Sequence, residues 1–236
     1  MRKHIPNILT MCNLSFGIFS IILASKGSIK LACYCIFIAG LFDFLDGFIA
    51  RLLTLSSEFG KQLDSLSDMI SFGVAPCFII LAIFDSNYSI NFSTHIVLLI
   101  IPICSALRLA KFNLNNEQNQ SFLGLPTPAN AMFLASLSLF ITSNCNYNIY
   151  INYYLLIFVV IVMALLLVIP MRFFSLKFTS YKWDKNLITY IFIIFSILII
   201  ITSFLLNNTT ISVAIIILLY ILISIVSNLI SYKKKL

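Results

Sequence analysis

Long hydrophobic segments recur along almost the whole chain and are separated by short polar stretches. The hydrocarbon core of a bilayer is about 30 Å thick, and roughly 20 apolar helical residues span it. Windows of this kind predict eight membrane-spanning helices joined by short loops. The expected helices cover residues 8–25, 31–53, 60–84, 93–110, 125–142, 151–168, 187–206 and 211–230. The pattern therefore predicts an all-α integral membrane bundle that forms a single membrane domain over residues 1–236.

The composition supports a membrane protein and argues against a soluble one. Hydrophobic residues make up 61% of the 236 residues and charged residues only 10%. Globular proteins average about 25% charged residues. One soluble core of this size cannot enclose so many apolar side chains, and a chain so poor in charge is not expected to bind nucleic acid.

The distribution of basic residues predicts the orientation of the helices. The chain has a formal charge of +7, and Lys and Arg are enriched in the cytoplasmic loops of membrane proteins. If the N-terminus is cytoplasmic, eight crossings leave only Lys26 and Lys30 outside. The other basic residues then lie inside, namely Arg2, Lys3, Arg51, Lys61, Arg108, Lys111, Arg172, Lys177, Lys182, Lys185, Lys233, Lys234 and Lys235. We expect a multi-pass protein of the inner (cytoplasmic) membrane with both termini in the cytoplasm.

The first apolar segment follows two basic residues, an arrangement that also fits a cleaved signal peptide. However, Asn7, Thr10 and Asn13 stand at its entrance. A signal peptide does not need such polar side chains, whereas a helix that faces a ligand can use them. We therefore expect this segment to remain in the mature protein.

Four of the eight acidic residues, Asp43, Asp46, Asp64 and Asp68, lie in the second and third expected helices. Each acid in a membrane helix costs about 2.5–3.5 kcal/mol on insertion scales and so needs a partner or a task. Asp43 and Asp46 are three residues apart and Asp64 and Asp68 four apart, so each pair shares one helix face. Because the two helices are antiparallel neighbours, all four carboxylates are expected to converge near the cytoplasmic side.

Converging carboxylates repel one another unless cations neutralise them, and hard divalent ions such as Mg²⁺ or Mn²⁺ prefer oxygen ligands. Two such ions, about 3.5 to 4 Å apart, can clamp the oxygens of a diphosphate. The small residues Gly47 and Ala50 would let a nucleotide approach the helix backbone. Two alternatives are structural salt bridges with Arg51 and Lys61, and a cation or proton relay in a transporter. A transporter more often places its acids near the bilayer midplane.

The order Asp43-x-x-Asp46-Gly47-x-x-Ala50-Arg51, followed by Gly60, Asp64 and Asp68, resembles the complete signature of the CDP-alcohol phosphotransferases. This resemblance implies an integral-membrane enzyme with a six-helix core. Such an enzyme displaces CMP from a CDP-linked lipid by an alcohol hydroxyl, and aspartates hold its divalent metals. The resemblance also implies a homodimer.

Carried over to this chain, the resemblance assigns roles to individual residues. Asp43, Asp46 and Asp64 would be metal ligands, and Asp68 would be the general base as well as a metal ligand. The residues expected to meet the head of CDP-diacylglycerol are Asn7, Thr10, Gly47, Ala50, Arg51, Ser57 and Gly60. Asn7 and Thr10 belong to the opening element Ile5-Pro6-Asn7-Ile8-Leu9-Thr10. An alternative for Asn7 is the N-cap of an ordinary helix.

Three stretches, residues 71–76, 105–113 and 124–131, resemble one branch of the family, the bacterial phosphatidylserine synthases. The similarity runs from Ile5 to about Lys177, so the catalytic core is expected over about residues 5–180, with two further generic helices over 187–230. This branch implies L-serine as the acceptor and phosphatidylserine and CMP as products. Acceptors such as glycerol phosphate or inositol phosphate are the alternatives within the family, and their phosphate would call for a denser basic pocket.

Three residues near the end of the fourth expected helix are candidates for binding serine or a phosphate. Arg108 and Lys111 can pair with a carboxylate or with the lipid phosphate, and Asn113 can contact an amino acid. The alternatives are that Arg108 and Lys111 snorkel to the membrane interface and that Asn113 is an exposed loop residue. Pro126 and Pro128 fit a rigid entry into the next helix, because proline is tolerated in a first turn.

Overall fold

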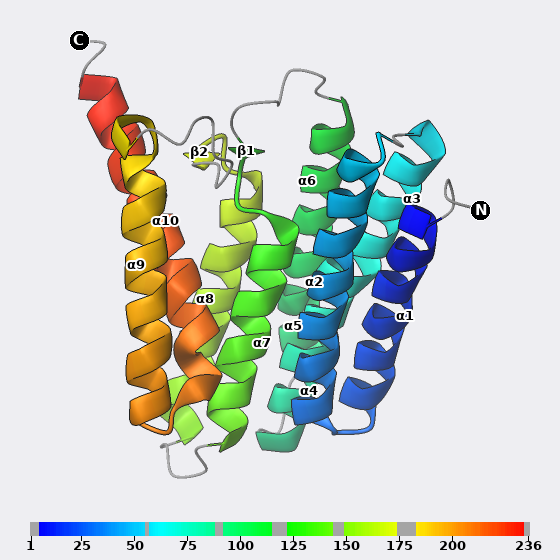
Figure 1. Cartoon of the computed structure of the whole chain (residues 1–236). Helices are drawn as coiled ribbons and strands as arrows, with labels where there is room; N and C mark the ends of the chain where they lie inside the picture. Colours follow the sequence, from blue (N-terminus) through cyan, green and yellow to red (C-terminus); the bar gives the residue numbers. More distant parts are fainter. Residues whose placement is uncertain are drawn as a thin grey trace.

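A computed structural model describes residues 5–54, 57–87, 92–114, 122–143, 149–173 and 183–233. These residues form a bundle of roughly parallel and antiparallel helices (Figure 1). In chain order the helical elements are α1 (Ile5–Ser25), α2 (Ile29–Leu52), α3 (Glu58–Asp68), the π-helix η2 (Met69–Val74), α4 (Ala75–Asn87), α5 (Phe92–Leu98), α6 (Ile100–Leu114), α7 (Thr127–Ser143), α8 (Ile149–Val168), α9 (Trp183–Leu205), the 3₁₀ turn η3 (Thr209–Ile211) and α10 (Ser212–Lys233).

Each of the eight expected hydrophobic segments is helical, which confirms the all-α fold class. The third segment is the continuous run of α3, η2 and α4, and the fourth contains α5 and α6. Within the described ranges, six helices are suited by length and composition to cross a membrane, while Tyr153–Val168 is a shorter apolar helix. The sequence did not predict the short antiparallel pair β1 (Phe122–Leu123) and β2 (Arg172–Phe173). Lys177, Lys182 and the tail residues 234–236 lie outside the described residues.

A tight turn joins α1 to α2 and makes them an antiparallel pair. Gly27 has φ +76, a left-handed conformation that glycine adopts without the steric cost of a Cβ. The Gly27 amide donates to the Ala24 carbonyl and the Ser28 amide to the Leu23 carbonyl. These two bonds satisfy carbonyls at the end of α1, as in a Schellman motif.

Helix α1 packs closely against the continuous helical run of α3, η2 and α4. The hydroxyl groups of Ser67 and Ser71 donate to the carbonyls of Thr10 and Asn13, each over 3.0 Å. A Cβ atom at Gly17 would meet the Ser71 side chain and approach its Cα to 2.7 Å. The glycine is therefore required by the close approach of the two backbones.

The π-helical turn Met69–Val74 begins directly after Asp68. Pro76 follows two residues later, and a proline inside an α-helix cannot donate to, and clashes with, the carbonyl four residues earlier. A wider turn before the proline relieves that conflict, and π-turns of this kind are frequent at functional sites.

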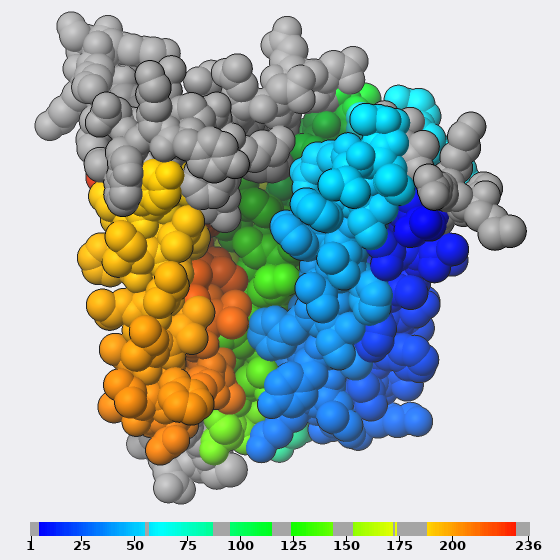
Figure 2. Space-filling model, viewed as in Figure 1, coloured from blue at the N-terminus to red at the C-terminus, as the bar shows by residue number. Residues whose placement is uncertain are grey.

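The C-terminal helices pack on the middle of the bundle. Ser136 of α7 donates to the Thr210 carbonyl over 2.6 Å and accepts from the Ala214 amide over 3.0 Å, so one side chain ties α7 to the start of α10. Many large apolar side chains of α9, such as Phe195 and Ile200, are exposed, as expected for a surface that meets lipid. Figure 2 shows α2 and the α9–α10 pair as two ridges with green residues recessed between them.

Helix α1 begins and α10 ends at the same end of the bundle, the upper end in Figure 1. The last turn of α2 and the beginning of α3 lie at this end too. The loop between α2 and α3 therefore brings the expected acidic residues toward the end of the bundle at which α1 begins and α10 ends.

Candidate active site

Three of the four expected aspartates form a compact cluster. Asp43 comes from α2, and Asp64 and Asp68 come from α3. One carboxylate oxygen from each lies within 4.8 Å of the others, a spacing at which the three can hold a metal ion. The i, i+4 spacing on α3 places Asp64 and Asp68 on one face, toward which Asp43 points. The predicted convergence of these three residues is therefore confirmed.

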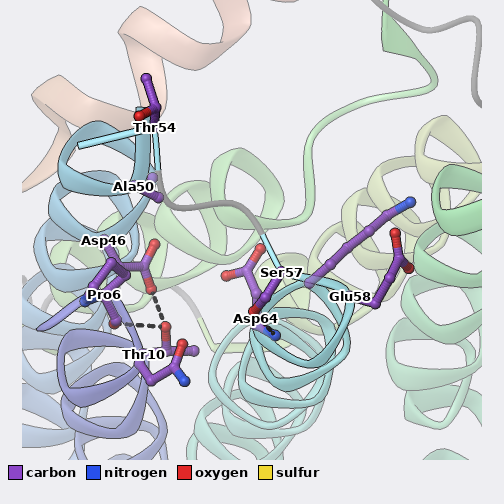
Figure 3. A pocket seen from close by; sticks show the side chains of 12 residues that line it. Pro6, Thr10, Asp46, Ala50, Thr54, Ser57, Glu58 and Asp64 are labelled. Atoms are coloured by element: carbon purple, nitrogen blue, oxygen red, sulfur yellow. Dashed lines mark hydrogen bonds between the residues drawn. The ribbon is translucent and has the colours of Figure 1, made fainter. Parts of the chain in front are cut away.

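Asp46 stands beside this cluster and faces a cavity. Its Oδ2 atom lies 2.7 Å from the Thr10 hydroxyl, which is also 3.0 Å from the Pro6 carbonyl. Asp46 and Asp64 lie on opposite walls of the cavity, on α2 and α3 (Figure 3). Asp46 is close enough to Asp64 for their charges to interact. The fourth aspartate thus connects the cluster to the cavity.

Asn13 belongs to the site, although it is not among the residues that the sequence predicts to bind metal or substrate. Its side chain is fully buried, with 0% of its surface exposed, and its Nδ2 atom donates to Asp68 Oδ1 over 3.2 Å. A signal was present in the sequence, because Asn13 follows Thr10 by three residues and so shares its face of α1. An uncharged polar side chain on that face of a membrane helix marks contact with a polar partner.

The cavity beside the aspartates has a volume of about 690 Å³. It opens between α1, α2 and α3, and Figure 3 shows Thr10 and Asp46 on one side of it and Asp64 on the other. Its lining contains Pro6, Asn7, Thr10, Asp46, Gly47, Ala50, Thr54, Ser57, Glu58, Gly60, Lys61 and Asp64. Six of the seven residues expected to contact the CDP-lipid lie in this lining. The seventh, Arg51, is exposed, and its Nη2 atom is 4.0 Å from the place of a Cβ at Gly47.

The beginning of α3 closes one side of the cavity. Ser57 is the N-cap of α3, with an extended backbone, and its hydroxyl accepts a hydrogen bond of 3.0 Å from the Gly60 amide. A Cβ at Gly60 would lie 3.3 Å from Asn7 Oδ1. Gly60 therefore permits α1 and α3 to approach each other here. Asn7 lies inside α1 rather than before it, so the alternative that it caps this helix is wrong.

Arg108 of α6 is buried next to the aspartate cluster, with 8% of its surface exposed. Its charge interacts with those of Asp68 and Asp43, and its Nη1 atom donates to the Thr127 hydroxyl over 3.0 Å. The alternative that Arg108 snorkels to the interface is therefore wrong. Lys111, one turn further along α6, is exposed, which agrees with an interfacial position.

Asn113 is half-buried inside α6 and is not the exposed loop residue of the alternative interpretation. Its Nδ2 atom donates to the Ser65 hydroxyl over 2.8 Å, and its carbonyl accepts from Lys61 Nζ over 3.2 Å. These contacts tie α6 to α3 beside Asp64. Since Lys61 bonds to this carbonyl, and no aspartate of the site forms a salt bridge among the described residues, the structural salt-bridge alternative fails.

The segment that leads into α7 places Thr127 opposite Arg108. Gly124 has φ +79, and a Cβ there would collide with the Leu167 carbonyl at the end of α8. The Leu125 amide donates to the Leu166 carbonyl over 2.9 Å, so the segment is fixed on α8. Helix α7 begins at Thr127, with Pro128 in its first turn, which confirms the expected rigid entry.

Fold and site together define an all-α membrane protein with a carboxylate cluster beside a polar cavity. Residues 3–170 match the family model described as CDP-alcohol phosphatidyltransferase. The chain therefore belongs to the CDP-alcohol phosphatidyltransferase family. The match ends before α9, so the last two helices lie outside the region that defines the family.

Several curated proteins resemble the chain. An archaetidylserine synthase of Methanothermobacter thermautotrophicus is 39% identical over 137 residues, which cover 57% of this chain and 58% of the relative. A CDP-diacylglycerol–serine O-phosphatidyltransferase of Methanocaldococcus jannaschii is 39% identical over 139 residues, covering 59% and 62%. A protein of the same name from Helicobacter pylori is 32% identical over 194 residues, covering 81% and 80%. The chain thus spans about three fifths of the length of the two archaeal relatives.

Proposed function

We propose that this protein transfers the phosphatidyl group of CDP-diacylglycerol to the hydroxyl of L-serine, giving phosphatidylserine and CMP. The observation that carries the proposal is the cluster of Asp43, Asp64 and Asp68 at the edge of a cavity of about 690 Å³. Relatives named for the serine reaction, 30–39% identical to this chain, support the choice of acceptor.

The cavity suits the diphosphate and nucleotide of the donor. Gly47, Ala50 and Gly60 leave space along the helix backbones, while Asn7 and Thr10 offer polar groups from α1. Arg51 at the rim can pair with phosphate oxygens, since a guanidinium matches their geometry. Ser57 serves both as the cap of α3 and as a polar lining residue.

The donor set consists of carboxylate oxygens, which fits the preference of Mg²⁺ or Mn²⁺. We propose that Asp43, Asp64 and Asp68 hold one ion and that Asp46, across the cavity from Asp64, takes part in holding a second. When bound, the ions would neutralise the charge of the diphosphate and of the departing CMP.

Asp68 is the proposed general base. It accepts the proton of the serine hydroxyl, whose oxygen attacks the lipid-side phosphorus of the donor. The bond between this phosphorus and the bridging oxygen breaks, and CMP leaves with the electron pair. Asn13, which donates to Asp68 Oδ1 over 3.2 Å, keeps one carboxylate oxygen occupied and so turns the other toward the acceptor.

Arg108 is the candidate of choice for the carboxylate of serine. Among the basic residues whose burial the structure describes, it is the one that is buried, and it lies near Asp68. Lys111 is exposed and the Asn113 side chain bonds to Ser65, which favours Arg108 over these two. A single buried cation suits a carboxylate better than the extra phosphate of glycerol phosphate or inositol phosphate.

We further propose that the site faces the cytoplasm from the inner membrane, where serine is available. Support comes from the excess of Lys and Arg that the eight-crossing arrangement assigns to the side of the termini. The homodimer implied by the family is a prediction that light scattering of the detergent-solubilised protein tests.

The function is tested by CMP release from CDP-diacylglycerol in detergent micelles, with Mn²⁺ or Mg²⁺ and one acceptor at a time. The acceptors are L-serine, glycerol 3-phosphate and inositol phosphate. We expect release that depends on serine and on the metal. Release with another acceptor would overturn the assignment of serine but would still support phosphatidyl transfer from CDP-diacylglycerol. No release with any acceptor would favour the alternative interpretation, a transporter that uses the acids as a cation or proton relay.

A further inference from the structure

Helix α10 reaches the candidate active site although it lies outside the residues that match the family. Its Tyr220 has 8% of its surface exposed and interacts electrostatically with the Arg108 guanidinium. Sequence alone predicts no role for the two C-terminal helices beyond membrane residence. The proximity of Tyr220 to Arg108 brings them near the charged centre of the protein.

Aromatic neighbours fix the ring of Tyr220. It stacks on Phe173 of β2 with ring centroids 5.7 Å apart and an interplanar angle of 24°. Phe192 of α9 meets it edge-on at 6.0 Å and 67°. Phe173 is itself fully buried, and β2 is paired with β1. Two elements, β2 and α9, thus hold one tyrosine ring in place through aromatic contacts.

The Arg108 guanidinium has one edge in use and another available. Nη1 donates to Thr127, whereas Nε is buried and has no hydrogen-bond partner in the described part of the chain. A buried donor without a partner is costly. The edge formed by Nε and Nη2 can receive a carboxylate through two parallel hydrogen bonds. The open edge therefore points to an anionic ligand with planar geometry.

The side chain of Asn130 in α7 is a second buried polar group without a hydrogen-bond partner in the described part of the chain. Its side chain is completely buried, and neither Nδ2 nor Oδ1 has a partner among the described residues. It follows Thr127 by three residues in α7 and so shares its face. Thr127 accepts the Arg108 hydrogen bond, so Asn130 lies on the face of α7 that meets Arg108.

We propose that Arg108, Thr127, Asn130 and Tyr220 form an acceptor subsite for the α-carboxylate and α-ammonium groups of an amino acid. The Nε edge of Arg108 binds the carboxylate, and Asn130 Oδ1 accepts from the ammonium. Tyr220 is a positioning residue that orients Arg108, so the C-terminal helix pair takes part in acceptor selection. The inference rests on the proposed function, because it names the groups that recognise its acceptor.

The first test compares Tyr220→Phe with the unsubstituted protein, using L-serine and L-serinamide as acceptors. Serinamide keeps the hydroxyl and ammonium groups but lacks the carboxylate. We expect the KM for serine to rise about fivefold to tenfold, because a charged hydrogen-bonding group loses its orientation. The kcat with serine, the KM for CDP-diacylglycerol and the kinetics with serinamide should stay within twofold. Tyr154→Phe, at an exposed position on α8, is the matched control and should change nothing.

The second test uses Asn130→Ala, with Ser138→Ala as a control that also truncates a buried polar side chain of α7. The KM should rise for serine and serinamide alike, because both acceptors carry the ammonium group. An unchanged serine KM in both Tyr220→Phe and Asn130→Ala would overturn the inference, as would an equal loss with both acceptors in Tyr220→Phe. Absence of serine transfer by the unsubstituted protein would instead overturn the proposed function, and the inference with it.

Discussion

Asn13 donates a hydrogen bond of 3.2 Å from its Nδ2 atom to Oδ1 of Asp68. One turn earlier on the same helix, Thr10 reaches Asp46 at 2.7 Å. Helix α1 thus contacts an aspartate of α2 and an aspartate of α3 with two side chains on one face. The first helix fixes the relative positions of the carboxylates, in addition to lining the cavity.

Replacement of Asn13 by alanine should lower turnover on the order of tenfold, because a hydrogen bond to a charged group is worth about 1.5–3 kcal/mol. The KM for CDP-diacylglycerol should change little. The rate of CMP release at saturating substrates measures this effect. Ser15→Ala, which removes an exposed hydroxyl bonded only within α1, is the control. Equal turnover of Asn13→Ala and the control would show that this contact does not orient Asp68.

Two conservative substitutions should separate the roles of Asp68 and Asp43. Asp68→Asn should remove turnover while sparing much of the metal-dependent binding of CDP-diacylglycerol, because the amide cannot accept the proton. Asp43→Asn should weaken both turnover and binding, because it removes a ligand oxygen. Lipid-binding titrations with and without Mn²⁺ give the comparison. Near-normal turnover of Asp68→Asn would end its assignment as the base.

Removal of divalent ions should abolish CMP release, and Mn²⁺ or Mg²⁺ should restore it. Paramagnetic resonance of Mn²⁺ can follow binding without turnover. We expect Asp64→Asn to weaken Mn²⁺ binding at least tenfold, because Asp64 belongs to the carboxylate cluster and loss of charge reduces affinity for a hard cation. Asp85→Asn, at an exposed acid outside the cluster, should leave binding unchanged. Full activity in excess chelator would contradict the metal assignment.

Gly17→Ala should destabilise the fold. Its new methyl group would lie 2.7 Å from Ser71 Cα, and overpacking of this kind typically costs about 1–3 kcal/mol. The unfolding temperature in detergent should fall by several degrees. Gly47→Ala is the stability control, because its methyl group would meet only the end of Arg51 at 4.0 Å. Matching unfolding temperatures for the two variants would show that α1 and η2 can move apart without cost.

Arg108→Ala should raise the serine concentration required for half-maximal rate more than the CDP-diacylglycerol concentration. The physical reason is the loss of a buried cation near the cluster. Separate titrations of the two substrates measure the effect. Lys111→Ala removes an exposed cation one turn away and should alter neither requirement. Equal changes in both requirements for Arg108→Ala would indicate a structural or phosphate-binding role.

The helices and the aspartate cluster were predictable because their signals are local. Apolar run length fixes a membrane helix, and spacings of three or four residues fix a shared face. Asp46 departs from the cluster because three residues turn a helix by about 300°, which leaves Asp43 and Asp46 about 60° apart. That difference is enough to direct one side chain to α3 and the other into the cavity.

Other parts of the site depend on packing between distant segments. The sequence showed Arg108 at a helix end, but only the arrangement of α7 and α10 shows that it is covered. Tyr220 lies 112 residues further along the chain. The apolar residues next to it in the sequence do not indicate a role in binding a polar ligand. Asn130 lies in the stretch 124–131 that shows the family resemblance, yet its complete burial arises from the helices around it.

The π-turn after Asp68 has a consequence for the length of this segment. Its wider hydrogen-bonded loop takes up about one residue more than an α-helical turn. Deletion of one residue between Met69 and Val74 would let the wide turn close as a regular helical turn, so the residues beyond it would keep about the same direction. The same deletion within the regular helix α4, just after Pro76, has no wide turn to absorb it and would rotate everything beyond it by about 100°. The acids would keep their azimuth while Ile79, Ile80 and Ile83, now buried, would swing away from the core. The π-turn therefore gives this segment a reserve of one residue in its length, whereas its buried side chains Ser71 and Phe72 are fixed by packing.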